Sequence, residues 1–226
     1  MKKLHITMIH DIVCSWCPIG YNNIKAAINR LNIEVDFHFL PYELNPDMDD
    51  KGELIENYFA RQMGWNESQL LDYQKSLVKT AKDSDVIIDF SKRKYYYNTK
   101  RAHLLMHLAE SNNKQEALNE LLIKAYFKEG LDINNISYLL EIAEEIGLDK
   151  INTQKVLTST RSYQELSKKT ERYKLFNVSS IPTFIINNSI LISGANSIDF
   201  FENELTKLID KFDMEEKQYN TYLTRR

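Results

Sequence analysis

Apolar and polar residues alternate over two short segments near the start of the chain. The first segment covers residues 4–9, and the second covers residues 33–40 and ends at Pro41. This two-residue period is typical of strands. Between them, residues 15–31 place apolar side chains at the spacing of one helix face. Strand, helix and strand predict a βαβ unit with parallel strands and a right-handed crossover.

The pattern becomes helical from about residue 53 to residue 176. Apolar stripes at three- and four-residue spacing run over 118–125 and 136–146. The exception is VIIDF at 86–90, for which we expect a short extended stretch.

The strand pattern returns near the end of the chain. TFIIN at 183–187 and ILIS at 190–193 are joined through two asparagines and predict a hairpin. A helix from about Ser197 follows and runs into the charged tail 213–226, whose terminal residues we expect to fray. No internal repeat or low-complexity linker separates these parts, so we interpret the helical block as an insertion into one α/β domain.

Composition narrows the function classes. The 226 residues are 43% hydrophobic, which suits a full core, and 29 basic against 32 acidic residues give a net charge of -3. This balance disfavours binding to nucleic acid or to an anionic membrane. No apolar run approaches the roughly 18 residues of a membrane span, so we expect a soluble protein. A cleaved leader of about 15 to 30 residues would remove Cys14, and we therefore expect a cytoplasmic location.

The only two cysteines, Cys14 and Cys17, are three positions apart at the start of the first predicted helix. A structural disulfide is disfavoured in a reducing compartment. A zinc site needs two further ligands, and His103 and His107 could supply them, but they lie far away in sequence. Redox catalysis is favoured because a helix N-terminus stabilises the attacking thiolate. We expect Cys14 to be the exposed nucleophile and Cys17 the more buried resolving thiol.

The residues beside the pair give less information. Neither Ser15 nor Trp16 is cationic, so backbone dipoles must supply most of the thiolate stabilisation, with the Ser15 hydroxyl as a candidate helper. The Trp16 indole has two interpretations, an aromatic surface for an apolar substrate or a part of the core. For Asp11 we favour a bond to backbone in the strand-to-helix turn over the role of proton acceptor for Cys17.

A C-x-x-C pair at a helix start and a proline directly before a hairpin resemble the thioredoxin fold, and the helical insertion resembles the DsbA-like branch. DIVCSWCPIG at 11–20 resembles the opening motif of FrnE-type oxidoreductases, which are related to 2-hydroxychromene-2-carboxylate isomerases and kappa-class glutathione transferases. NTKRAH at 98–103 and VSSIPTF at 178–184 also match that pattern, and the resemblance runs from about Lys3 to Leu208.

The resemblance implies an α/β, thioredoxin-like fold with βαβ and ββα halves and a large all-helical, DsbA-like insertion. We assign residues 1–45 and 177–212 to the thioredoxin-like domain, with a helix over 160–176 leading into it. Residues 46–176 form the insertion, and 213–226 form the charged tail.

The resemblance also implies a substrate site. Ile181 and Pro182 would face the cysteines across a cis peptide bond, and the Ile181 backbone would dock an extended substrate. His103 would either line the cleft or be satisfied by its neighbours. Family members usually carry Pro and an aromatic residue where this chain has Ser15 and Pro18, which leaves the direction of disulfide exchange open.

The implied function is a thiol-disulfide oxidoreductase acting on protein or small-molecule thiols and disulfides, without metal or nucleotide. Glutathione or another small thiol is a candidate co-substrate. Two alternatives stay open: a glutathione-dependent isomerase or transferase, and a non-catalytic redox-sensing adaptor. The sequence gives no oligomeric state.

One basic stretch lies outside these motifs. KRKYYYNTKR at 92–101 packs five basic residues around three tyrosines, a composition that suits single-stranded nucleic acid. Because the net charge is negative, we expect instead a solvated basic rim with one or two tyrosines packed inward.

Overall fold

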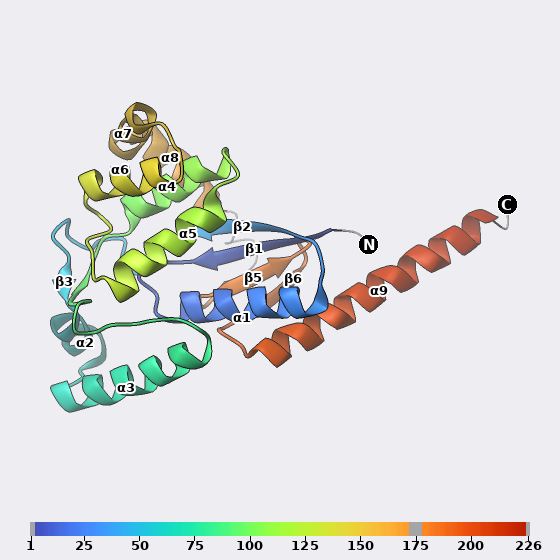
Figure 1. Ribbon diagram of the computed structural model, residues 1–226, viewed down its shortest axis with the longest axis horizontal. Coiled ribbons are helices and arrows are strands. Elements are labelled where there is room, and N and C mark those ends of the chain that lie inside the picture. The colour runs from blue at the N-terminus through green and yellow to red at the C-terminus, as the bar shows by residue number, and fades with distance from the viewer. Residues whose placement is uncertain (1–2, 172–177, 225–226) are drawn as a thin grey trace.

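The computed structural model describes the backbone of residues 3–171 and 178–224, and the side chains of residues 3–171 and 178–211. Its elements occur in the expected order of a βαβ half, a helical block and a ββα half (Figure 1). The elements are β1 (Leu4–His10), α1 (Trp16–Leu31), β2 (Val35–Pro41), β3 (Glu53–Leu54), α2 (Ile55–Met63), α3 (Glu67–Asp83), β4 (Tyr95–Tyr96), α4 (Lys100–Glu110), α5 (Gln115–Ile123), the π-helical η1 (Lys124–Lys128), α6 (Ile136–Glu145), α7 (Lys150–Thr158), α8 (Thr160–Thr170), β5 (Thr183–Ile186), β6 (Ile190–Ser193) and α9 (Ile198–Thr224).

The central sheet has the strand order β2-β1-β5-β6. β1 and β2 are parallel, while β5 runs antiparallel to both β1 and β6. Asn187 and Asn188 join β5 to β6 with φ of 48° and 56°. Two consecutive positive φ angles are the requirement of a type I′ turn, and asparagine tolerates them, so the turn residues explain the hairpin.

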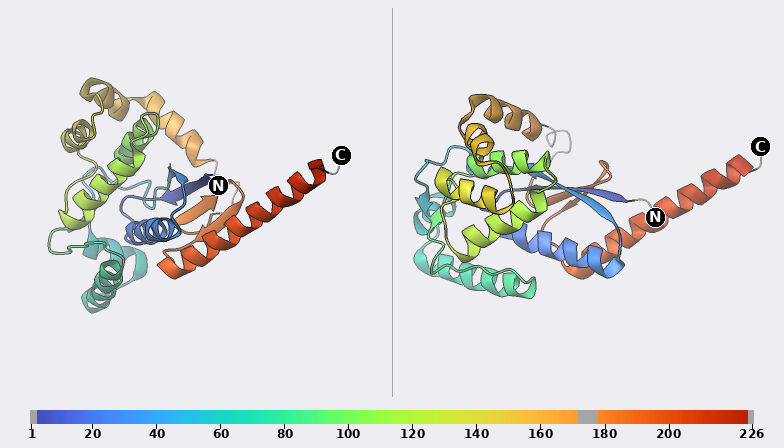
Figure 2. Two further views of the ribbon diagram at one scale, coloured as in Figure 1. Left: turned by 45° about the vertical axis from the view of Figure 1, so that its right-hand side comes forward. Right: turned by 45° about the horizontal axis from the view of Figure 1, so that its top comes forward.

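Two helices, α1 and α9, pack against each other on one face of the sheet (Figures 1 and 2). Tyr21 of α1 meets Phe37 of β2 edge to face, and Phe201 of α9 meets Phe184 of β5 in the same way. Met8 lies between these contacts, because it is in register with Phe39 on one side and Phe184 on the other. This face therefore carries the main core of the α/β part.

The insertion, α2 to α8, packs on the central sheet at its β2 edge through three of its helices. α4, α5 and α8 all contact β2. The Gln115 side chain of α5 accepts a hydrogen bond from the Phe39 N–H at 3.1 Å and donates to the Phe39 carbonyl at 3.4 Å. Edge strands expose unpaired backbone groups, so Gln115 protects β2 from pairing with another chain.

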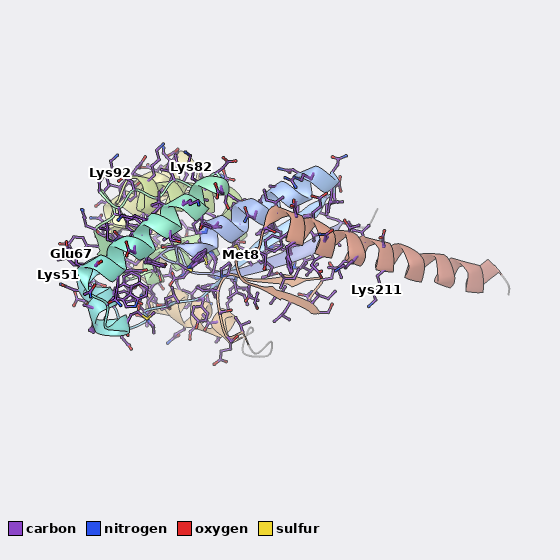
Figure 3. The ribbon with its side chains drawn as sticks, turned by 90° about the horizontal axis from the view of Figure 1, so that it is seen from below. Met8, Lys51, Glu67, Lys82, Lys92 and Lys211 are labelled. Carbon is purple, nitrogen blue, oxygen red and sulfur yellow. The ribbon has the colours of Figure 1, made fainter. Side chains whose placement is uncertain are left out.

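Several expectations differ from the structure. Residues 86–90 join no sheet and form a loop in which Val86 and Ile88 are buried, so the expected extended stretch there is not a strand. The last helix is longer than expected, because α9 continues through the charged segment to Thr224 and leads away from the body beyond Lys211 (Figure 3). The helix expected over 160–176 ends at Thr170, and residues 172–177 lie outside the described part.

Among the described residues, no helix combines the length and the apolarity needed to cross a membrane.

Candidate active site

The two cysteines lie where β1 leads into α1. Ser15 is the N-cap of α1, so Cys14 precedes the helix and Cys17 lies in its first turn. The Cys14 N–H donates to the Asp11 carbonyl at 3.1 Å, and the Cys17 N–H donates to the Cys14 carbonyl at 3.1 Å. Both cysteines are free thiols. Two successive tight turns thus hold the pair together at the carboxyl end of β1.

The expected exposure of Cys14 was wrong. Cys14 is 6% exposed and Cys17 is 2% exposed, so both are buried and the first is only slightly more accessible. Trp16, at 39% exposed, lies on the surface, which excludes its interpretation as a core residue. Tyr73 of α3 interacts with both the Cys14 thiol and Trp16. Tyr73, a residue of the insertion, therefore lies near the pair, which the pattern at the helix start alone does not predict.

The environment separates the two thiols in acidity. The Cys17 thiol donates a hydrogen bond that lowers the pKa of Cys14, and the N–H groups of Trp16 and Cys17 act in the same direction. Burial and the Asp11 charge oppose this shift. Burial raises the pKa of Cys17 well above its ordinary value, and its hydrogen bond to Cys14 adds to the effect. Of the two thiols, this arrangement therefore makes Cys14 the more readily ionised.

A buried arginine lies next to the pair. The Arg93 guanidinium donates to the Ser15 hydroxyl at 3.0 Å and to the Val13 carbonyl at 3.2 Å, so it holds the residues on both sides of Cys14. Arg93 is only 2% exposed, and none of the described carboxylates forms an ion pair with it. Four rings surround the guanidinium at 4.6 to 5.3 Å, those of Phe90, Tyr96, Tyr126 and Phe127.

The expected solvated basic rim was wrong for Arg93. Lys92 and Lys94 are exposed, while Arg93 and Tyr96 point inward. Burial raises the pKa of Tyr96 and of Tyr126, so their hydroxyl groups stay neutral beside the cation. Arg93 is therefore an unneutralised positive charge under the cysteine turn. The sequence contains one indication of this burial. Arg93 is three positions before Tyr96, the middle residue of the tyrosine run 95–97.

The loop that carries Arg93 is held by close backbone contacts. The Arg93 N–H donates to the Asp89 carbonyl at 2.8 Å, and the Asp89 N–H donates to the Phe127 carbonyl at 2.8 Å. Gly130, with φ of 70°, lies against Lys92 so closely that a Cβ atom there would be 2.3 Å from the Lys92 carbonyl oxygen. Only glycine fits both the positive φ and this approach.

The peptide bond between Ile181 and Pro182 is cis. Pro182 is buried and packs on Gly20 of α1, where an added Cβ would lie 2.9 Å from the proline Cγ. Gly20 is about one helical turn after Cys17, so the proline lies against the helix that carries Cys17. Ile181 is partly exposed.

Comparison with known proteins decides the family. Residues 5–206 match the family described as DSBA-like thioredoxin domain. The chain belongs to this family. The expected α/β thioredoxin-like fold with a helical insertion is thereby confirmed.

Three relatives illustrate the likeness. The uncharacterized protein YwbO of Bacillus subtilis is 29% identical over 205 residues, which cover 90% of this chain and 96% of that protein. A probable DsbA oxidoreductase of Streptomyces coelicolor has a TM-score of 0.82 at 22% identity, covering 90% of this chain and 89% of that one. The cytosolic disulfide reductase DsbM of Pseudomonas aeruginosa, solved with GSH, has a TM-score of 0.63 at 13% identity, covering 91% and 99%.

In this DSBA-like domain, Asp11 and His103 form a buried polar pair behind the cysteines. One Asp11 carboxylate oxygen accepts from the Leu44 N–H at 2.7 Å, and the other lies 3.3 Å from His103 Nε2. Nε2 also lies 3.1 Å from the Tyr42 carbonyl. Asp11 thus bonds to backbone, but to a later loop and not to its own turn. His103 is 1% exposed, and its Nε2 has these partners, while its buried Nδ1 has no hydrogen-bond partner among the described residues.

The structure gives no support to a shared zinc site. His107 contacts Glu110 at 3.4 Å. Among the described residues, neither His103 nor His107 joins the cysteines in a cluster able to hold a metal ion. The nearby His10 is buried, and its pKa lies well below the ordinary value because of burial and the charge of His103.

Proposed function

We propose that this DSBA-like domain is a FrnE-type thiol-disulfide oxidoreductase with Cys14 as nucleophile and Cys17 as resolving thiol. The observation that carries the proposal is the pair of free thiols held by two tight turns at the start of α1 in a DSBA-like domain, and the opposite pKa shifts of the two groups agree with it. A thiolate beside a retained thiol is the starting state that disulfide exchange needs.

The proposed reaction has two steps. The Cys14 thiolate attacks one sulfur of a substrate disulfide, which forms a mixed disulfide and releases the first substrate thiolate. Cys17 then loses its proton and attacks the Cys14 sulfur, which expels the second substrate thiolate and leaves a Cys14–Cys17 disulfide. The substrate gains two electrons and the protein loses two. Two molecules of a small thiol such as glutathione would restore the dithiol and leave as their disulfide, and the same steps run backward for oxidation.

The surroundings of the pair support protein and small-molecule thiols or disulfides as substrates. Trp16, two residues after Cys14, offers an exposed aromatic surface. Ile181, before the cis proline, is partly exposed, and we propose that its backbone pairs with an extended substrate segment near the cysteines. The likeness to DsbM solved with GSH supports glutathione as a co-substrate in a cytoplasmic setting.

An insulin-reduction assay with dithiothreitol or glutathione tests the assignment. We expect Cys14→Ser to abolish turnover, and Cys17→Ser to accumulate a mixed disulfide with the substrate without turnover. Equal activity of Cys14→Ser and the parent would refute the nucleophile assignment. Full activity in Cys17→Ser with saturable glutathione binding would favour the isomerase or transferase. Oxidation-dependent capture of a protein without turnover would favour the adaptor.

A further inference from the structure

Two histidines and an aspartate gather on the sheet, at the opposite end of β1 from the cysteines. His5 Nδ1 lies 3.3 Å from Asp36 Oδ2, and His38 Nε2 lies 3.1 Å from the same oxygen. The two imidazole rings are 4.7 Å apart, and one ligand atom from each of the three residues lies within 4.8 Å of the others. The redox chemistry proposed above uses none of these groups.

The strand register explains why they meet. In the parallel β1–β2 pair, His5 is opposite Asp36 and Thr7 is opposite His38. Side chains two residues apart on a strand point to the same face, so these four share one face, while neighbouring Ile6 and Phe37 point into the core. The backbone ladder fixes the three ligand positions before any ligand arrives.

We propose that His5, Asp36 and His38 form a binding site for a divalent transition-metal ion, and that this ion is zinc. Zinc bonds of about 2.0 to 2.2 Å in tetrahedral geometry place neighbouring ligand atoms roughly 3.4 Å apart. The two measured separations, 3.1 and 3.3 Å, match this spacing. Imidazole and carboxylate are suitable ligands for zinc, and three protein ligands leave a fourth position for water.

Solvent reaches the three side chains, and the Thr7 hydroxyl lies beside the His5 ring. The three side chains are 36%, 49% and 33% exposed, so an ion can enter without rearrangement of the fold. Thr7 Oγ1 lies 3.5 Å from His5 Nε2, the ring nitrogen that faces away from Asp36. When His5 binds metal through Nδ1, its remaining proton lies on Nε2 and is donated to Thr7. A hydrogen bond to the ring nitrogen that does not bind the metal orients the imidazole.

The test must exclude the cysteines, which also bind zinc and cobalt. We therefore use the full chain with Cys14→Ser and Cys17→Ser and titrate it with cobalt(II), followed by zinc(II) displacement. The expected result is saturable binding of about one equivalent, with weak visible bands and without the intense near-ultraviolet band of a cobalt thiolate. Zinc should also raise the melting temperature of the same protein, since the folded state binds the ion.

Matched variants assign the site. In the same background, His5→Gln and Asp36→Asn should each weaken cobalt binding at least tenfold. Thr7→Val should weaken it about tenfold, because the variant loses the hydrogen bond to the His5 ring. His107→Gln, a histidine paired with a carboxylate on α4, is the control and should bind cobalt like its parent. Circular dichroism verifies that each variant is folded, and Asp36→Asn preserves side-chain shape. Absence of saturable binding, or equal affinity in Asp36→Asn and the parent, would overturn the proposal.

Discussion

Replacing Arg93 by methionine removes the buried positive charge beside Cys14 and keeps an unbranched side chain of similar length. The variant loses the hydrogen bonds to the Ser15 hydroxyl and the Val13 carbonyl. We expect the pKa of Cys14 to rise, since a cation stabilises the thiolate relative to the thiol.

The size of the effect follows from the geometry. The guanidinium bonds to both neighbours of Cys14 at 3.0 and 3.2 Å, so for the calculation we take a separation from the sulfur on the order of 7 Å, about two residue spacings of 3.8 Å. At that distance and an effective dielectric constant of about 20, two unit charges interact by roughly 2 kcal/mol. This energy corresponds to more than a tenfold decrease in the acid dissociation constant of the Cys14 thiol. The folding free energy is a poorer readout, because the cost of burying a cation offsets its hydrogen bonds by several kcal/mol.

The assay is the rate of iodoacetamide alkylation against pH, with mass spectrometry to verify that Cys14 alone reacts. Arg93→Lys is the matched control. Lysine keeps the charge, but its single ammonium group lacks the planar pair of donors that binds Ser15 and Val13 at the same time. We expect the midpoint to rise in the order parent, Arg93→Lys, Arg93→Met. If folded Arg93→Met has the same midpoint as the parent, the charge does not act on the thiolate and the reasoning is wrong.

Three further changes probe separate features. Trp16→Ala should slow the reduction of an apolar peptide disulfide several-fold and leave the alkylation profile of Cys14 unchanged; equal rates for the peptide would refute a substrate role. Gly130→Ala should destabilise the fold by about 2 kcal/mol or more in urea, because the strained φ and the contact with Lys92 cannot both persist. The hydrogen bond from His107 lowers the pKa of Glu110 from 4.5 to about 2, so its stabilising contribution is present above pH 4.5 and lost as the pH falls toward 2. Glu110→Gln should therefore lose stability at pH 6 by less than about 1 kcal/mol and very little at pH 2; equal losses at both would contradict this.

The sequence predicts those features that depend on local period and turn chemistry. The strand at 4–9, the helix after Cys14 and the hairpin around Asn187 follow from alternation, helical spacing and residues that tolerate positive φ. The short β3–β4 pair was not predicted, because two-residue strands are too short to show a period.

The sequence does not predict features that depend on tertiary contacts. The segment 92–101 has the composition of a solvated face, and only the packing of η1 and the 86–90 loop turns Arg93 inward. The same limit applies to the metal-binding cluster. His5 and Asp36 are far apart in the chain, and their meeting depends on the register of β1 and β2, which alternation alone leaves undetermined.

The buried arginine also bears on the direction of disulfide exchange. Ser15 and Pro18 depart from the usual family residues, and side chains between two cysteines are expected to tune their potential. Here the Ser15 hydroxyl accepts a hydrogen bond from Arg93, so its effect is inseparable from that cation. A charge that stabilises the Cys14 thiolate stabilises the reduced protein and makes its disulfide more oxidising. The Asp11 charge acts in the opposite direction on the same sulfur. Since Arg93 comes from the insertion and Asp11 from the turn that follows β1, we expect the potential to be set by how closely these two parts pack around Cys14.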